Sequence, residues 1–269
     1  GLAKFNYATF SSTNGSDLRF TDAGGVNELS YEIERWNTSG ISHVWVQIPS
    51  LTTGSHIYAY WGRPHAPAPP QLGMRLWLKA DAGVQTNVSG NITNWLDQSG
   101  NANHVSQTFT GNSPSFVPGA MNGMPVARFD GDDQLVKALP SLPAGDQPRT
   151  VLLVSKNATR SGDLYPFSYG SAALNQSFGI DLGDSVRVVG FGNDHGIGIG
   201  VTTNPRLYAV TYDSASLDTL VDGVSGFPSD RIYDTGTSNL FIGSFTDASF
   251  HFFGDIAEVL VYDRVLSAA

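Results

Sequence analysis

The chain has 269 residues, of which 41% are hydrophobic, with 30 glycines, 14 prolines and no cysteine. Its formal net charge of −9 argues against a nucleic-acid partner, because phosphate binding needs clustered Lys and Arg and only 15 are present. The lack of cysteine excludes disulfides and thiolate metal sites. No apolar run approaches the ~20 residues of a spanning helix, so we expect no membrane insertion. An acidic, cysteine-free chain rich in Asn, Ser, Thr and Gly is typical of exported bacterial proteins, which predicts an extracellular or cell-surface location.

The first quarter of the chain predicts four strands. Each segment alternates apolar and polar residues, as strands with one buried face do. Turn residues such as Gly24 and Gly25 separate them. The expected strands are residues 17–22, 29–36, 43–49 and 57–62.

A proline-rich segment follows at residues 63–71, where four prolines fall within seven positions. Proline at this density forbids a helix and favours an extended spacer. We therefore predict a partial β domain over residues 1–63, a linker over residues 64–72 and a second domain over residues 73–269.

The second domain has the pattern of many short antiparallel strands. Residues 206–213 and 217–223 form a natural hairpin, with a polar tip at residues 214–216. Successive antiparallel strands of this kind pack as two sheets. The predicted fold class is an all-β antiparallel sandwich, with strands near residues 76–79, 126–129, 149–155, 176–182, 185–191, 206–212, 217–221, 240–243 and 250–262.

Four motifs of the second domain resemble a laminin-G-like jelly roll of the concanavalin A-like lectin/glucanase superfamily. They are Trp-Leu-Asp-Gln-Ser-Gly-Asn-Ala-Asn-His at residues 95–104, Val-Ala-Arg-Phe-Asp-Gly-Asp-Asp at residues 126–133, Leu-Val-Asp-Gly at residues 220–223, and the closing segment 252–267. The resemblance implies that the closing strand runs through the core, with Ile256, Val259 and Val261 as packing residues. After the closing strand, Asp263 and Ser267 are residue types typical of a turn and of a helix start.

The N-terminal segment resembles a bacterial domain of unknown function that often precedes lectin-like jelly rolls in secreted or surface proteins. The resemblance rests on Asp-Leu-Arg-Phe from Asp17, Tyr-x-Ile-Glu-x-Trp from Tyr31, Val-Trp-Val from Val44 and Tyr-Trp-Gly from Tyr60. Members usually begin with two further strands, which residues 1–16 do not supply. An open sheet edge would need another segment or another copy to cover it, so strand donation between chains is one hypothesis.

Catalytic signatures are missing from the sequence. It contains no His-Glu-x-x-His, no Gly-x-Ser-x-Gly and no phosphate loop. Glucanases of the resembled superfamily carry two carboxylates on one strand, a Glu-x-Asp-x-x-Glu pattern that this chain lacks. Glu32 and Glu34 share a strand face but are typical of solvated edge residues, and the glycine-rich segment 196–200 favours a strand or loop over a dinucleotide site.

Calcium binding is the more plausible chemistry. Calcium takes six to eight oxygen ligands, which clustered Asp and Asn on glycine-rich turns provide. The resemblance to laminin-G-like domains implies one structural calcium ion without naming its ligands. The alternative, that these carboxylates only form turns and cap strands, stays open. The candidate ligands are Asp97, Asn101, Asp130, Asp132, Asp133, Asp255 and Glu258.

Sugar binding would use aromatic faces flanked by polar side chains, because flat rings stack on pyranose C–H groups. Trp36, Trp45, Trp77 and Trp95 lie in strand patterns and favour core positions. The candidate ligand-binding residues, expected on loops, are Tyr165, Tyr169, Phe191, Asn193, Asp194, His195 and Tyr233.

The sequence thus predicts a non-catalytic extracellular binding module for polysaccharide or cell-surface glycan. One alternative is a structural subunit of a surface adhesin or extracellular filament that pairs with other copies of itself. A third hypothesis is a polysaccharide hydrolase or lyase with an unusual carboxylate pair.

Overall fold

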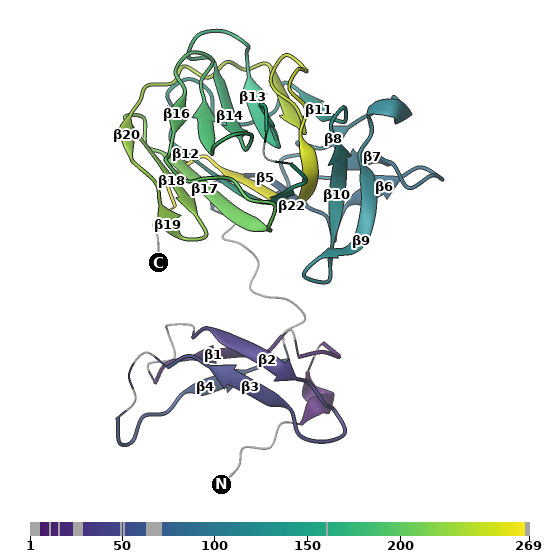
Figure 1. The fold of residues 1–269 in the computed structure, drawn as a ribbon, viewed down its shortest axis with the longest axis vertical. Coiled ribbons are helices and arrows are strands. Elements are labelled where there is room, and N and C mark those ends of the chain that lie inside the picture. Colours follow the sequence, from purple (N-terminus) through teal and green to yellow (C-terminus); the bar gives the residue numbers. More distant parts are fainter. Residues whose placement is uncertain are drawn as a thin grey trace. The chain divides into compact units, whose positions relative to one another are not determined.

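The chain divides into two compact units, residues 1–70 and residues 71–269 (Figure 1). The proline-rich segment 63–71, the turn at Gly24 and Gly25, and the helix start expected at Ser267 lie outside the described residues. In the described part of the chain, no helix is long and apolar enough to cross a membrane. The computed structural model describes residues 6–10, 12–15, 17–23, 29–48, 50, 52–62, 72–159 and 161–266.

The first unit contains two antiparallel sheets of two strands each among its described residues. All four strands coincide with segments that the alternating pattern predicted. After the short 3-10 helix η1 (Tyr7–Thr9), β1 (Arg19–Thr21) pairs with β4 (Tyr58–Tyr60), and β2 (Tyr31–Arg35) pairs with β3 (His43–Val46).

A small apolar core holds the first unit together. Leu18, Phe20 and Leu29 are buried at its centre, and Trp36 packs partly buried against them. Trp45 corrects the prediction of core tryptophans, because its side chain is 68% exposed and its indole N–H donates a hydrogen bond to Glu34. The strand's alternation places Trp45 on the outer face, opposite its two valine neighbours.

The second unit is a β-sandwich of two large antiparallel sheets (Figure 1). The strand order of the first sheet is β19 (Val224–Ser225), β18 (Ser216–Val221), β17 (Arg206–Tyr212), β12 (Arg149–Asn157), β22 (Phe253–Tyr262), β10 (Met124–Asp130) and β9 (Ser115–Met121), with β20 (Ser229–Asp230) beside β18 and β5 (Met74–Lys79) beside β22. The second sheet runs β16 (His195–Gly196), β15 (Arg187–Val189), β14 (Ser177–Asp181), β13 (Phe167–Gly170), β21 (Asn239–Ile242), β11 (Leu135–Ala138), β8 (Val105–Ser106), β7 (Ile92–Trp95) and β6 (Val84–Thr86), and the short 3-10 helix η2 (Thr110–Asn112) precedes β9. The all-β sandwich predicted from the sequence is confirmed.

The closing strand β22 lies in the middle of the first sheet, where it pairs with β12, β10 and β5. Ile256, Val259 and Val261 are fully buried, which confirms their predicted packing role. A register shift leaves Ala257 as an extra residue opposite β12, and this bulge changes the alternation along the strand. Ile256 therefore faces the core, and Asp255 faces outward beside Arg128.

Arg149 is fully buried in the core at the start of β12. Its guanidinium donates to the Tyr169 hydroxyl at 2.7 Å, to Thr235 Oγ1 at 2.8 Å and to three backbone carbonyls. The guanidinium carbon also lies 5.0 Å from the Phe178 ring centroid and 5.3 Å from that of Tyr212. Hydrogen bonds and ring faces thus replace the solvation that this cation lost on burial.

The strands that the sequence predicted in the second unit are present, including the hairpin of β17 and β18. Nine others were not predicted: β8, β16, β19 and β20, which are two residues long, and the longer strands β6, β7, β9, β11 and β13. Their burial does not alternate: Phe167–Gly170 is buried throughout, and Ser115–Met121 is mostly half-exposed. A period-two pattern is therefore not available in these segments.

Candidate functional site

An aromatic groove lies where three loops of the second sheet meet. Tyr165 comes just before β13, Phe191 follows β15, and Phe245 and Phe250 lie in the loop between β21 and β22. The groove encloses about 370 Å³, within the usual range for ligand pockets. Its lining is formed by Tyr165, Leu174, Val189, Phe191, Gly192, Asp194, Phe245 and Phe250.

The rings form a buried floor and exposed walls. Tyr165 and Phe245 are 5% and 3% exposed, and their ring centroids lie 4.6 Å apart. Phe191 stacks parallel to Phe245 at 6.1 Å, and Phe250 lies 6.2 Å from Tyr165. Phe191 and Phe250 are 40% and 53% exposed. Two rings are therefore held at the surface by contact with two that are not.

Both exposed rings are carried by strained backbone. Phe191 has φ 57° and Phe250 has φ 52°, in the left-handed region that bulky side chains rarely adopt. Such a conformation costs about 1–3 kcal/mol and persists where the surrounding structure imposes it, frequently at binding sites. Burial does not account for this cost, because both rings remain partly in water.

Polar groups border the apolar floor. Asp194 lines the groove and accepts a hydrogen bond from the Gly190 N–H at 3.0 Å. Burial raises the pKa of the Tyr165 hydroxyl, and the negative charges of Asp181 and Asp163 raise it further. The hydroxyl therefore stays neutral at ordinary pH and keeps its proton for donation.

The structure brings together three of the predicted sugar-binding residues, Tyr165, Phe191 and Asp194, in this groove. Five lining residues were missed: Leu174, Val189, Gly192, Phe245 and Phe250. A signal was present for two of them, because Phe245 and Phe250 flank the polar turn Asp247-Ala248-Ser249, which indicates a loop that carries two aromatic rings.

The structure buries two of the predicted sugar-binding residues, Tyr169 in β13 and Tyr233 in the segment between β20 and β21. Their side chains are 2% and 0% exposed, so neither ring can reach a surface sugar. Tyr169 points into the sandwich from β13 and donates to the Pro143 carbonyl at 2.9 Å. Tyr233 packs edge-on against Phe178 and Tyr212.

Asn193 and His195 lie beside the groove but do not line it. His195 belongs to β16, and its Nε2 lies 2.6 Å from the Phe227 carbonyl. Asn193 donates to the Ile232 carbonyl at 2.9 Å and accepts a hydrogen bond from Arg231 at 2.8 Å. Asn193 lines a second, more polar cavity.

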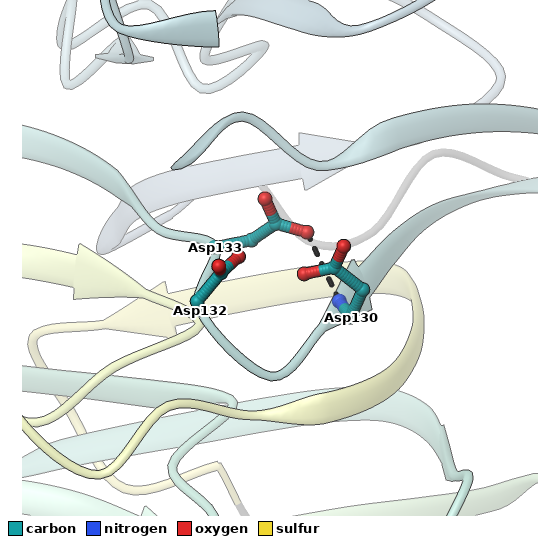
Figure 2. A group of neighbouring side chains, drawn as sticks. All are labelled: Asp130, Asp132 and Asp133. Atoms are coloured by element: carbon teal, nitrogen blue, oxygen red, sulfur yellow. Dashed lines mark hydrogen bonds between the residues drawn. The ribbon is translucent and has the colours of Figure 1, made fainter. Parts of the chain in front are cut away.

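A separate cluster of three carboxylates occupies the end of β10 and the loop after it. Asp130, Asp132 and Asp133 place one carboxylate oxygen each within 4.8 Å of one another, the one such group among the described residues (Figure 2). Asp133 is 4% exposed and accepts a hydrogen bond from the Asp130 N–H at 3.0 Å. Burial beside Asp130 and Asp132 raises the pKa of Asp133 to about 7.

This donor set fits a hard divalent cation. Calcium prefers carboxylate oxygens, and a bound cation would favour the ionised form of carboxylates that burial and neighbouring charges keep protonated. The pKa of Asp132 is also raised, chiefly by its hydrogen bond with Asp130, and His251 nearby has its pKa lowered by burial. Asp130, Asp132 and Asp133 are the residues that would hold calcium, and the ion would order their loop.

The other predicted calcium ligands do not join this cluster. Asp97 accepts four hydrogen bonds, three within its own turn region from Ser99 N, Ser99 Oγ and Asn103 N, and one from Trp77 N in β5. The side-chain amide of Asn101 donates to the Met74 carbonyl and to Ser99. These contacts correspond to the turn-forming alternative considered from the sequence.

Asp255 and Glu258 are also occupied. Arg128 donates to both carboxylate oxygens of Asp255, at 2.7 and 2.9 Å. Glu258 accepts from the Trp77 indole at 2.6 Å. The bulge in β22 directs both carboxylates to the outer face of the sheet, where the neighbouring strands supply these partners.

A sequence family described as "Domain of unknown function (DUF2341)" matches residues 14–71. The match covers the segment in which the sequence motifs resembled a domain of unknown function. No curated protein matches the chain in sequence.

Solved structures share the sandwich fold. A GH54 α-L-arabinofuranosidase soaked with a cyclic sulfate inhibitor superposes with a TM-score of 0.55 at 16% identity, covering 66% of this chain and 48% of its own. An arabinofuranosidase complexed with arabinofuranosyl-α-1,2-xylobiose has a TM-score of 0.54 at 16% identity, with the same coverage. The binding domain of Paraclostridial Mosquitocidal Protein 1 has a TM-score of 0.50 at 13% identity, covering 72% of this chain and 50% of its own. The chain spans about half the length of these structures, and the likeness establishes the fold.

Proposed function

We propose that this protein is a non-catalytic extracellular glycan-binding module that takes up polysaccharide at the aromatic groove. The observation that carries the proposal is the pair of phenylalanines, Phe191 and Phe250, held exposed on left-handed backbone above buried rings. Sugar rings present apolar C–H faces that stack on such surfaces, while hydroxyls need nearby polar groups. Asp194 and the Tyr165 hydroxyl meet that need.

The groove supports binding better than hydrolysis. Glycoside hydrolysis needs two carboxyl groups on either side of the scissile bond. Among the described residues that line the groove, Asp194 is the single carboxylate. Incubation with a panel of polysaccharides, followed by an assay for new reducing ends or unsaturated products, tests the hydrolase and lyase alternatives directly.

We further propose that the chain consists of a partial β domain at residues 1–63, a linker at residues 64–72 and a second domain at residues 73–269. The second domain is proposed to be a laminin-G-like jelly roll. The sequence motifs and the two-sheet sandwich support this assignment. A structural calcium at Asp130, Asp132 and Asp133 belongs to the same proposal, supported by the carboxylate geometry and the raised pKa values.

Binding to a panel of immobilised polysaccharides that includes xylan and arabinan tests the glycan proposal. Phe191→Ala and Phe250→Ala are each expected to weaken binding about tenfold or more, because each removes a stacking face. Phe109→Ala is the matched control, since Phe109 is 66% exposed beside η2 and does not line the groove. No binding to any glycan, or an equal loss in the control, would overturn the proposal.

A second candidate function is a subunit of a surface adhesin or filament. Each of the four strands of the first unit pairs with one other strand among the described residues, and the Phe20 carbonyl of β1 also accepts a hydrogen bond from the Leu29 N–H. The second edge of β2, β3 and β4 has no strand beside it in the described part of the chain. Free edges can accept a strand from another copy. Size-exclusion chromatography and electron microscopy check this candidate; a monodisperse monomer at high concentration would contradict it.

A further inference from the structure

A second cavity adjoins the aromatic groove. It encloses about 710 Å³, and Gly192 lines both spaces. Leu174 lines the groove and its neighbour Asn175 lines the second cavity. Likewise, Asp194 lines the groove and its neighbour Asn193 lines the second cavity. The same two loop segments therefore border both spaces, which meet at Gly192.

The second cavity differs from the groove in its chemistry. Most of its lining residues are polar, among them Asn193, Ser214, Asp230 and Arg231. Asn175 and Ser214 have positive φ angles, 63° and 82°, so strained backbone also occurs on this side. One space offers aromatic faces and the other offers hydrogen-bonding groups.

Arg231 is the most informative side chain in the second cavity. Its Nη1 donates to Asn193 Oδ1 at 2.8 Å, and no ion pair is formed with any described carboxylate. Its Nε is buried without a hydrogen-bond partner. The amide of Asn193 is itself fixed by the Ile232 carbonyl, so its oxygen is directed to Arg231. A guanidinium positioned in this way, with Nη donors left over, is suited to a ligand's oxygen atoms.

We infer that the two spaces form one extended site for a neutral oligosaccharide chain, in which one sugar stacks in the aromatic groove and the next sugars bind at Arg231. This inference rests on the proposed glycan-binding function. Neutral sugars fit because Arg231 is a donor and Asp230 and Asp194 are acceptors, matching hydroxyls that do both. Two carboxylates against one guanidinium, in a chain of net charge −9, disfavour an acidic glycan.

Calorimetric titration of the full chain with xylo-, arabino- and cello-oligosaccharides of one to six sugars tests the inference. Affinity is expected to rise with chain length. Arg231→Ala is expected to weaken the longer ligands about tenfold, because a charged hydrogen-bond donor is lost, and to leave the shortest binding ligand unchanged. Phe250→Ala is expected to weaken every length.

Two controls keep the result interpretable. Arg206→Ala removes an arginine at the opposite end of the β17 and β18 hairpin, outside both spaces, and is expected to bind like the unaltered protein. Equal thermal unfolding midpoints of Arg231→Ala and the unaltered protein show that the variant is folded. Arg231→Lys keeps the charge but loses the planar guanidinium, and it is expected to lose affinity for long ligands only.

Two different failures are distinguishable. If Phe250→Ala abolishes binding but affinity is independent of length, or Arg231→Ala acts equally at all lengths or not at all, the extended site is wrong and glycan binding stands. Tighter binding of oligogalacturonides than of the neutral series would likewise overturn the neutral assignment. If no oligosaccharide or polysaccharide binds, the proposed function fails together with the inference.

Discussion

The aromatic groove and the buried cluster of Arg149 with the rings of Tyr169, Phe178, Tyr212 and Tyr233 both consist largely of aromatic residues, but the rings have different roles. Tyr169 and Tyr233 lie in the interior with 2% and 0% exposure, whereas Phe191 and Phe250 stand at the surface on left-handed backbone. Burial explains the first set completely, because its rings pack and Arg149 has hydrogen-bond partners. Burial does not explain the second set. An aromatic residue indicates a binding surface only where the fold keeps it exposed at a cost.

The largest expected effect is at the buried cluster. Arg149→Met removes the cation that bonds the Tyr169 hydroxyl, Thr235 and three backbone carbonyls, and leaves several of these groups unpaired. We expect the free energy of unfolding to fall by about 3–5 kcal/mol. Urea unfolding followed by tryptophan fluorescence measures it. A loss below about 1 kcal/mol would mean that the cluster is not structural.

The two buried tyrosines provide the matched control. The Tyr169 hydroxyl bonds Arg149 and the Pro143 carbonyl, so Tyr169→Phe is expected to cost about 1–3 kcal/mol. The Tyr233 hydroxyl has no hydrogen-bond partner, so Tyr233→Phe is expected to be neutral or slightly stabilising. Neither change is expected to alter glycan binding.

The carboxylate cluster of Asp130, Asp132 and Asp133 extends the comparison, because burial there changes the pKa of a charged side chain and not the exposure of a ring. The folded pKa of Asp133, about 7, lies above its ordinary value of 3.8, so ionisation is easier in the unfolded chain. In EDTA the stability contributed by this group is complete below pH 4 and is lost as the pH rises from about 4 to about 7. Asp133→Asn removes that slope, and calcium is expected to raise the melting temperature of the unaltered protein but not of the variant.

Asp213 is the control for this titration. Its pKa is lowered by hydrogen bonds from the Ser216 and Ala215 N–H groups, so its contribution is lost as the pH falls. Asp213→Asn should therefore change the acid side of the stability profile. An Asp133→Asn profile parallel to that of the unaltered protein between pH 4 and 7 would contradict the proposed burial of charge.

The smallest expected effect on stability concerns the backbone of the groove. Phe250→Gly and Phe250→Ala both remove the ring, but only glycine relieves the left-handed strain at φ 52°. We expect the glycine variant to be more stable than the alanine variant by about 1 kcal/mol, with glycan binding weakened equally in both. At Phe109, where φ is −93°, the order of stability should reverse. If the glycine and alanine variants have the same order of stability at both positions, left-handed backbone strain at Phe250 does not contribute to the stability of the groove.

Period-two alternation and turn residues predicted the first unit's strands and the long strands of the second. This worked for β12 and β17 because they are long and their burial largely alternates. The closing strand β22 is buried on both faces and was identified from its β-branched and aromatic residues instead. Alternation failed for β13, whose four residues are all buried. It also failed for β9, whose mixed exposure hides any period.

The candidate site was predictable only in part. Phe191 and Asp194 were identified because they lie in an evident polar loop, and Asp130, Asp132 and Asp133 because their chemistry is local in sequence. Phe245 and Phe250 were missed because they join the groove from a loop more than 50 residues away from Phe191 in the chain. Tyr169 was misassigned because a strand too short to show a period was interpreted as a loop.

The sequence by itself determined the β class and the local carboxylate cluster, since these depend on alternation and on neighbours in the chain, and its resemblance to laminin-G-like domains implied which residues of the closing strand pack inward. Only the tertiary structure decided which aromatic rings are exposed, that Gly192 joins the aromatic groove to a polar cavity, and that Asp255 and Glu258 are already paired. The physical reason is that exposure and pairing depend on distant loops and on one bulge in β22, which local periodicity does not encode.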